Sequence, residues 1–188
     1  MRQLSVLYTG NQQCYSVRYS PFDNSLLACV SCDKFGLSGS SSLYILQYVE
    51  NSFLNSKFQI NESFRSNVTM FDCDWSPVDP QLLLTANGDG SVSVWKWPNN
   101  NNNSTTSAND RKSMLTQRQH SKEIYSVQWE PSGMRSYHFL TASWDQSIKI
   151  WNMSSNGLTA LTSLSGHESL VYSGIVIKLS FFFFLNIS

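Results

Sequence analysis

The second half of the chain carries the residue types of a hydrolytic triad. His120 precedes a run of alternating apolar residues, Asp145 follows the next run, and serines flank this aspartate. A His that is oriented by an Asp can activate a Ser nucleophile. However, Asp145 belongs to an Asp-x5-Trp motif that ends at Trp151, and the same motif joins Asp89 to Trp95. Because the set recurs along the chain, we expect a structural hydrogen-bonded network and no enzyme.

The four cysteines offer a second chemical possibility. They are Cys14, Cys29, Cys32 and Cys73, and their spacing resembles no disulfide framework. The Cys29–Cys32 pair forms a CxxC, but it lies at the end of a predicted strand, not at a helix N-terminus that would activate a thiol. A zinc site would need a second pair of ligands. We therefore expect structural thiols, no metal and no cofactor.

Composition narrows the class of partner and the compartment. The formal net charge is zero, and no Lys/Arg cluster provides a phosphate-binding patch, so nucleic acid is not an expected partner. The first ten residues contain no apolar stretch long enough for a signal peptide. Free cysteines and no leader indicate a reducing, cytosolic compartment. The 13% aromatic content, with six Trp, favours β structure.

Three segments of the chain can be laid over one another. They begin at Tyr15, Phe71 and Tyr125, and each runs through alternating apolar residues to a proline. The prolines are Pro21, Pro77 and Pro131, at steps of 56 and 54 residues. Alternation in "SVSVWKW" and "SIKIW" predicts strands, and "NGDGS" predicts a hairpin turn. Repeats of four short strands that end in Trp are typical of propeller blades.

Twelve strands follow from this pattern. They are expected at 15–20, 26–31, 43–48 and 57–61, at 70–75, 82–86, 92–97 and 113–117, and at 124–129, 138–143, 147–152 and 159–164. A fourth blade is expected to begin near Leu170. The Asn-rich segment 98–110 cannot bury apolar surface, so we expect a disordered loop there.

The motifs resemble those of the WD40-repeat family. In that family a His before the first strand, a Ser or Thr, the turn Asp and the Trp form a network in each blade. The resemblance implies a structural network from residues on several blades: His120, Asp145 and Trp151, then Asp89 and Trp95, with His167 before the fourth blade. The first repeat departs from the pattern, since "LYILQY" replaces a strand that ends in Trp.

A narrower resemblance is carried by "KFGLSGSSSLYIL", "HSKEIYSVQW", "SWDQSIKIW" and "GHESLVYS". These stretches, within Tyr15 to Ser173, are similar to the receptors for the type 2 peroxisomal targeting signal, the peroxin 7 family. The resemblance implies an all-β, partial WD40 propeller over 1–173. Its blades are expected near 11–62, 63–118 and 119–165, with the start of a fourth at 166–173 and an apolar tail at 174–188.

The resemblance also implies a cytosolic receptor that delivers peroxisomal matrix proteins, shuttles to the peroxisome, and works with a co-receptor and a docking complex. The signal that it binds is a short amphipathic helix with a basic residue. Carboxylates beside aromatics suit such a helix. We expect Glu123 and Glu168 to pair with the basic residue, and Tyr125, Trp144 and Tyr172 to contact its apolar face. Glu62 and Asp72 complete the candidate set, with Glu62 expected in a loop.

Other interpretations stay open at this stage. The chain could be a general WD40 scaffold of another complex, or an inactive truncated product, because three blades and a fragment do not close a ring. The tail "GIVIKLSFFFFLNIS" lacks the expected Trp-Ser-Pro continuation. Lys178 lies at the centre of the apolar stretch from Leu170 to Ile187 and opposes membrane insertion. We therefore expect no stable insertion, and interpret the tail as translated intron or a gene-model error.

Overall fold

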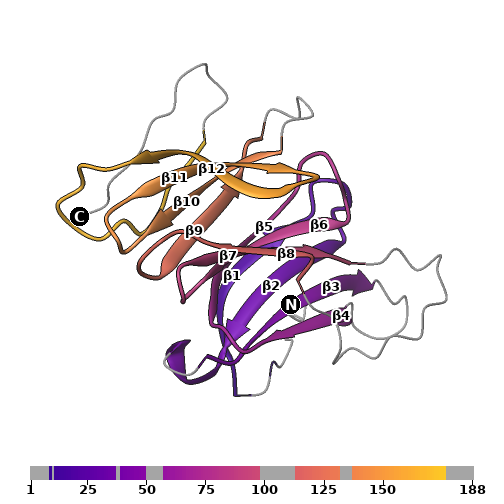
Figure 1. Cartoon of the computed structure of the whole chain (residues 1–188). Helices are drawn as coiled ribbons and strands as arrows, with labels where there is room; N and C mark the ends of the chain where they lie inside the picture. Colours follow the sequence, from indigo (N-terminus) through magenta and orange to yellow (C-terminus); the bar gives the residue numbers. More distant parts are fainter. Residues whose placement is uncertain are drawn as a thin grey trace.

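The described part of the chain forms three four-stranded antiparallel sheets (Figure 1). The computed structural model describes residues 9, 11–36, 39–49, 57–97, 113–131 and 137–176. Within each sheet the strand order follows the sequence. The strands are β1 (Gln13–Tyr19), β2 (Leu26–Cys32), β3 (Ser41–Val49), β4 (Lys57–Ser66), β5 (Met70–Trp75), β6 (Leu82–Asn87), β7 (Ser91–Lys96), β8 (Leu115–Arg118), β9 (Ile124–Trp129), β10 (His138–Ser143), β11 (Ile148–Ser154) and β12 (Gly157–Leu164).

All twelve predicted strands are confirmed, with ends that differ by a few residues. The largest difference is in β4, which continues to Ser66 instead of ending near residue 61. Glu62 therefore lies within β4, opposite Ile45 of β3, and the prediction that it lies in a loop is wrong. Phe64, beyond the predicted end, is buried and pairs with Leu43 of β3, so the strand continues.

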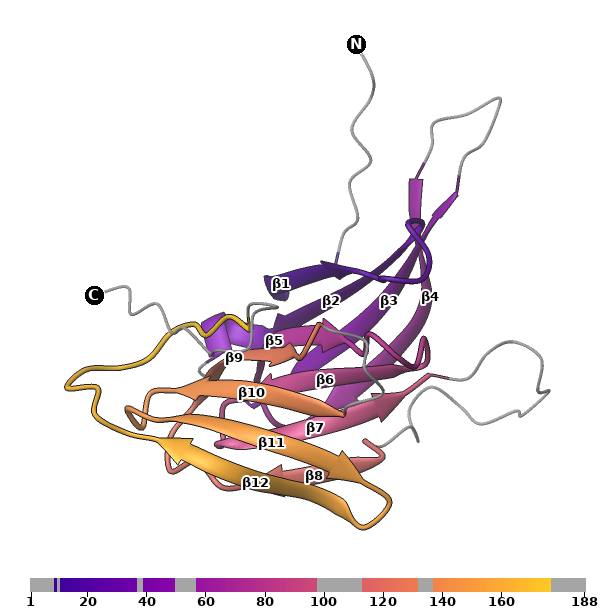
Figure 2. The same cartoon turned by 90° about the horizontal axis from the view of Figure 1, so that it is seen from above.

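The sheets stack side by side as blades, with β1, β5 and β9 nearest one another (Figure 2). Alternate residues of β6 face opposite ways, as a strand requires. Leu83 packs in the cluster between blades one and two, with Trp75 and Trp95. Leu82 and Leu84 pack in the cluster between blades two and three, which also holds the Trp151 ring. The middle blade is therefore buried on both faces, which explains why β6 is continuously apolar up to Thr85.

We call β1, β5 and β9, the first strands of the three blades, the inner strands. Side chains of one inner strand also bind the backbone of the next. Asp74 of β5 accepts the Trp129 N–H of β9 at 2.8 Å, and Asp72 accepts the Val127 N–H at 3.1 Å. Gln128 of β9 accepts the Val176 N–H at 2.8 Å in the same way. These bonds use donors on the free edge of each inner strand, which would otherwise lack a ladder partner.

The segment after β12 occupies the place of a fourth inner strand. Val171 and Val176 are buried against Leu140, Ala142 and Ile148 of blade three. Residues 165–176 form no strand, so the start of a fourth blade at 166–173 stays a prediction. The segments expected as a disordered loop (98–110) and as most of the apolar tail (177–188) lie outside the described residues. No helix in the described part of the chain is long and apolar enough to span a membrane.

Candidate functional site

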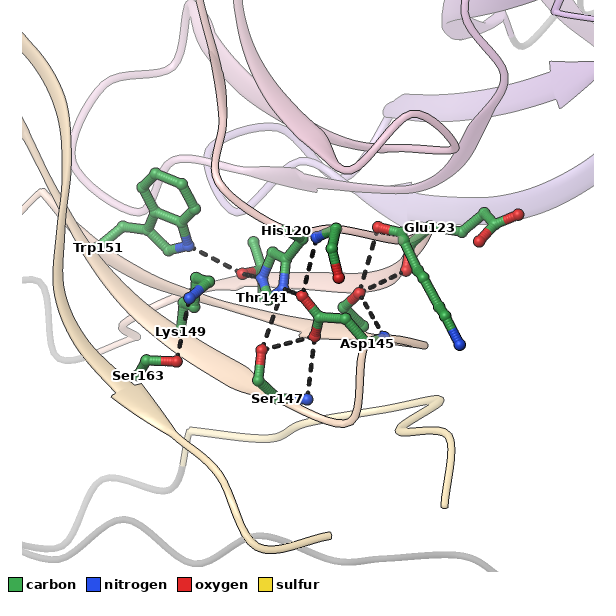
Figure 3. Close-up of polar contacts among 11 residues, drawn as sticks. His120, Glu123, Thr141, Asp145, Ser147, Lys149, Trp151 and Ser163 are labelled. Atoms are coloured by element: carbon green, nitrogen blue, oxygen red, sulfur yellow. Dashed lines mark hydrogen bonds and ion pairs between the residues drawn. The ribbon is translucent and has the colours of Figure 1, made fainter. Parts of the chain in front are cut away.

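The His120 network is a closed chain of hydrogen bonds inside blade three (Figure 3). His120 Nδ1 lies 2.8 Å from Asp145 Oδ2, and His120 Nε2 lies 2.7 Å from Thr141 Oγ1. Trp151 Nε1 donates to the same Thr141 oxygen at 2.8 Å. Because a carboxylate only accepts, Nδ1 carries the proton and Nε2 accepts from the threonine hydroxyl. Both ring nitrogens of His120, the Thr141 hydroxyl and the Trp151 N–H thus each have a partner within the network.

The protonation states follow from these contacts. Burial lowers the pKa of His120, and it outweighs the hydrogen bond and the charge of Asp145, so the imidazole is neutral at pH 7. Burial alone would raise the pKa of Asp145. Hydrogen bonds from Ser147, His120 and the Ser121 N–H outweigh it and lower that pKa to about 2. Ser147 donates to Asp145 at 2.6 Å, so this serine is held by the carboxylate and is not activated as a nucleophile.

Blade two builds the same network without a histidine. Trp95 Nε1 donates to Thr85 Oγ1 at 2.9 Å, as Trp151 does to Thr141. Thr85 then donates to Asn87 Oδ1 at 3.0 Å, and the Asn87 amide donates to Ser91 and Ser93. The sequence predicted Asp89 for this network, but within the described residues that aspartate accepts from the Ser91 hydroxyl and N–H and not from Thr85 or Trp95. Asn87 therefore replaces the histidine of blade three.

A row of aromatic rings crosses one edge of the three blades. We call it the aromatic ladder; its members are Tyr15, Phe71, Tyr125, Trp144 and Tyr172. Phe71 stacks on Tyr125 at 4.3 Å between ring centroids, and Tyr125 stacks on Trp144 at 4.5 Å. Tyr15 meets Phe71 edge-on at 5.3 Å, and Tyr172 meets Trp144 edge-on at 5.6 Å. The two end rings, Tyr15 and Tyr172, are exposed.

The ladder follows from the repeat. Tyr15, Phe71 and Tyr125 each open the first strand of a repeat, and Tyr172 holds the same place at the start of the fourth. Stacking blades side by side brings these equivalent positions together. Tyr125, Trp144 and Tyr172 were predicted at the site, whereas Tyr15 and Phe71 were not. The signal that could have found them was their common position in the overlaid repeats.

The connection between β2 and β3 passes beside the Phe71 ring of the ladder. Gly36 lies in the β2–β3 connection with φ of +77°, and a Cβ there would stand 2.8 Å from the Phe71 ring. Lys34 and Phe35 before it also have positive φ, which is uncommon outside glycine. Phe35 is 71% exposed beside this turn. The "KFG" segment therefore forms a left-handed turn that leaves room for Phe71 and presents another aromatic ring.

The four carboxylates predicted for the binding site divide into two groups by their position. Glu123 directly precedes β9, and its carbonyl accepts the Trp144 N–H at 3.0 Å, while its side chain extends away from the His120 network (Figure 3). Burial, the Tyr15 ring and the Glu123 charge raise the pKa of Tyr125. The Glu168 carbonyl accepts from Gln146 in the turn that carries Trp144. Both glutamates thus lie at the edge that bears the ladder.

Asp72 and Glu62 lie elsewhere. Asp72 is buried between the blades, where it accepts the Cys73 and Val127 N–H groups and meets Arg18 at 3.4 Å. Burial raises its pKa, although hydrogen bonds and the Arg18 charge act in the opposite direction. Glu62 is half-buried on the outer strand β4. His167, predicted for the network of a fourth blade, lies half-buried in the loop after β12.

Comparison with known proteins agrees with this architecture. The model of the WD domain, G-beta repeat, matches residues 60–96 and 111–152. These ranges contain the strands of blade two and most of blade three, with both Thr–Trp bonds. A peroxisomal targeting signal 2 receptor of Dictyostelium discoideum is 34% identical over 138 residues, which is 73% of this chain and 39% of that protein.

Two animal proteins of the same name give longer matches. The protein from Mus musculus is 30% identical over 161 residues, or 86% of this chain and 45% of the relative. The protein from Homo sapiens is 29% identical over 170 residues, or 90% of this chain and 47% of the relative. The chain belongs to the family of WD40 proteins that includes the peroxisomal targeting signal 2 receptors.

The relatives' names indicate a receptor family. The relatives are named as receptors and not as enzymes, in keeping with a His–Asp pair whose hydrogen-bonding groups are all used within blade three. The chain spans less than half the length of these three relatives. Within the described residues, no group of three or more His, Cys, Asp or Glu side chains could hold a metal ion.

Proposed function

We propose that this chain binds the type 2 targeting signal of peroxisomal matrix proteins at the edge that bears the aromatic ladder. The observation that carries the proposal is the continuous row of rings across three blades, with Glu123 and Glu168 at the same edge. An amphipathic helix needs an elongated apolar surface for one face and an anionic group for its basic residue. The relatives' name supports this class of ligand.

Each side chain has a distinct role in this proposal. The exposed Tyr15 and Tyr172 rings contact the apolar face of the signal helix, and Phe71 and Tyr125 hold the row in register. Glu123 and Glu168 pair with the basic residue of the signal. Asp72 supports this surface from below, because its carboxylate joins β1, β5 and β9. Glu62 lies on the outer strand of blade one, so we assign it no contact with the helix.

In the cell, the proposal makes the chain part of a cytosolic receptor that collects matrix proteins and brings them to the peroxisome. A co-receptor would close over the bound signal, and a docking complex would receive the loaded receptor. The relatives' name supports the receptor role alone, and the support for shuttling, the co-receptor and the docking complex is the family resemblance.

Binding of a synthetic type 2 signal peptide, measured by fluorescence anisotropy, tests the proposal. We expect Glu123→Gln and Glu168→Gln each to weaken binding about two- to five-fold at low salt, the effect of losing one exposed ion pair. Glu130→Gln, beyond the opposite end of β9, is the matched control and leaves binding unchanged. A peptide whose basic residue is neutral should bind wild type and both variants alike.

Two results would overturn the proposal. One is no saturable binding of the signal peptide by the folded 188-residue chain. The other is binding that is lost equally in Glu130→Gln and in the two ladder-edge variants, because general charge attraction would then explain it.

A further inference from the structure

Two cysteines that belong to different strands of blade one lie in contact. Cys14 lies on β1 and Cys29 on the neighbouring β2, and their Sγ atoms are 3.3 Å apart. Both are free thiols. Cys14 is exposed to solvent and Cys29 is buried. A disulfide requires the sulfurs to approach to about 2.05 Å, so a shift of roughly an ångström would bond them.

A β-bulge brings the two sulfurs to the same face. Cys14 pairs with Ser31 and Ser16 with Val30, so Tyr15 is the extra residue of β1. In a regular strand, residues 14 and 17 would point to opposite faces. The bulge turns Cys14 onto the face of Val17, whose cross-strand partner is Cys29. The contact therefore depends on a specific backbone irregularity.

The remaining cysteines are in different surroundings. Cys32 and Cys73 are completely buried. Burial and the nearby Asp33 raise the pKa of Cys32 to about 11, and burial also raises the pKa of Cys73. For Cys29, burial and the hydrogen bond with Cys14 raise the pKa to about 12. Of the chain's four thiols, only Cys14 is placed to meet a reagent from solvent.

We propose that Cys14 and Cys29 form a redox site, in which hydrogen peroxide converts the thiol pair to a cross-strand disulfide. The Cys14 thiolate attacks one peroxide oxygen and breaks the O–O bond. Cys14 becomes a sulfenic acid, and the departing hydroxide takes up a proton to form water. The Cys29 sulfur then attacks the Cys14 sulfur and expels a second hydroxide, which takes the Cys29 proton and leaves as water.

In sum, two thiols lose two electrons and two protons, and one peroxide becomes two waters. An excess of a dithiol such as dithiothreitol reverses the step by exchange. The disulfide fixes the start of β1 to β2, and the next residue, Tyr15, is the first ring of the aromatic ladder. The redox state of the Cys14–Cys29 pair thus determines how rigidly Tyr15, at that end of the ladder, is held. This site would exist whether or not the chain binds a targeting signal.

Peptide mapping of the reduced, folded 188-residue chain after treatment with hydrogen peroxide tests the proposal. The remaining thiols are alkylated before digestion. We expect one linked peptide pair that contains Cys14 and Cys29, an intact mass lower by two hydrogens, and alkylated Cys32 and Cys73. Cys32→Ser is the matched control and still forms the link.

A second variant separates the two steps. Cys29→Ser lacks the resolving sulfur, so Cys14 sulfenic acid should persist and react with dimedone, whereas wild type gives little dimedone adduct. The proposal is overturned if wild-type Cys14 proceeds to sulfinic acid without a link to Cys29. It is equally overturned if the linked pair includes Cys32 or Cys73, or if Cys29→Ser forms no dimedone adduct at Cys14.

Discussion

Asp74 carries a half-buried charge that the fold would be more stable without. Its carboxylate accepts the Trp129 N–H at 2.8 Å, but burial is the larger influence and raises its pKa from 3.8 to about 6. A raised folded-state pKa means that the folded chain holds this proton more tightly than the unfolded chain. The resulting stabilisation is complete below about pH 4 and is lost as pH rises through about 6.

Asp74→Asn removes the charge and keeps an oxygen that can accept the Trp129 N–H. A shift of roughly two pKa units corresponds to about 3 kcal/mol, so the variant should gain up to about 3 kcal/mol of unfolding free energy at pH 7.5. Near pH 4 the wild-type carboxyl is already neutral, and the two proteins should be similar. Urea unfolding at a series of pH values measures the difference between them, in which groups common to both cancel.

Asp74→Ala is the control for the hydrogen bond. It removes the charge and the acceptor together, leaves the Trp129 N–H unpaired, and should be less stable than Asp74→Asn by about 1–3 kcal/mol at every pH. The reasoning is refuted if Asp74→Asn is no more stable than wild type at pH 7.5 and the difference between them does not change with pH.

Three further changes test other parts of the structure. Thr141→Val keeps the side-chain shape but leaves His120 and Trp151 without their shared partner, so unfolding free energy should fall by about 2–5 kcal/mol in urea titrations; a loss under 1 kcal/mol would contradict the network. Gly90→Ala places a Cβ 2.4 Å from the His120 carbonyl oxygen at a φ of +82°, and thermal unfolding should show a loss of about 2–5 kcal/mol. Tyr19→Lys places a charge on the exposed face of blade one, where Tyr19 is 65% exposed. Self-association measured by sedimentation velocity should decrease, while the unfolding free energy changes by less than about 0.5 kcal/mol. Unchanged self-association would exclude this face as the contact between copies.

The Tyr19 prediction comes from comparing equivalent faces of two blades. Trp75 of blade two occupies the place of Tyr19 and is only 3% exposed, because blade one covers it. Cys73 occupies the place of Val17, and their exposed fractions are 0% and 53%. Blade one thus presents an apolar sheet face of the kind that blade two buries, and such faces favour association.

The strands were predictable because their signals are local. Period-2 alternation in β7 and β11 and the repeat of the pattern along the chain located the strands, and "NGDGS" located the hairpin at Gly90, whose φ is +82°. The matching turn of blade three has Gln146 at φ of +68°. The "NGDGS" motif correctly placed the first of these turns, because the type of a backbone turn is set by four or five neighbouring residues.

The parts that the sequence did not predict depend on positions that are remote in the chain. Asn87 takes the role of the histidine, but it lies at the end of β6 and not before β5. A search for a His before the first strand of blade two could therefore not find it. Cys14 reaches Cys29 only through the bulge at Tyr15, and the CxxC motif pointed to Cys32 instead. Asp72 was expected at the binding surface, but the alternation of β5 directs it to the buried contact with β9.

The candidate binding surface is a consequence of how the blades are held in register. Asp74 binds the Trp129 N–H, and Gln128 at the equivalent place in β9 binds the Val176 N–H. Each such bond fixes the height of one inner strand against the next, and therefore fixes where the first aromatic residue of each repeat lies. Tyr125 can stack on Phe71 and meet Tyr172 because these bonds hold β5, β9 and the extended segment that ends at Val176 level with one another. Alignment of the ladder therefore needs an acceptor oxygen at position 74, and Gln128 shows that an amide can supply one. The half-buried charge of Asp74 lowers stability at neutral pH without being required for that alignment.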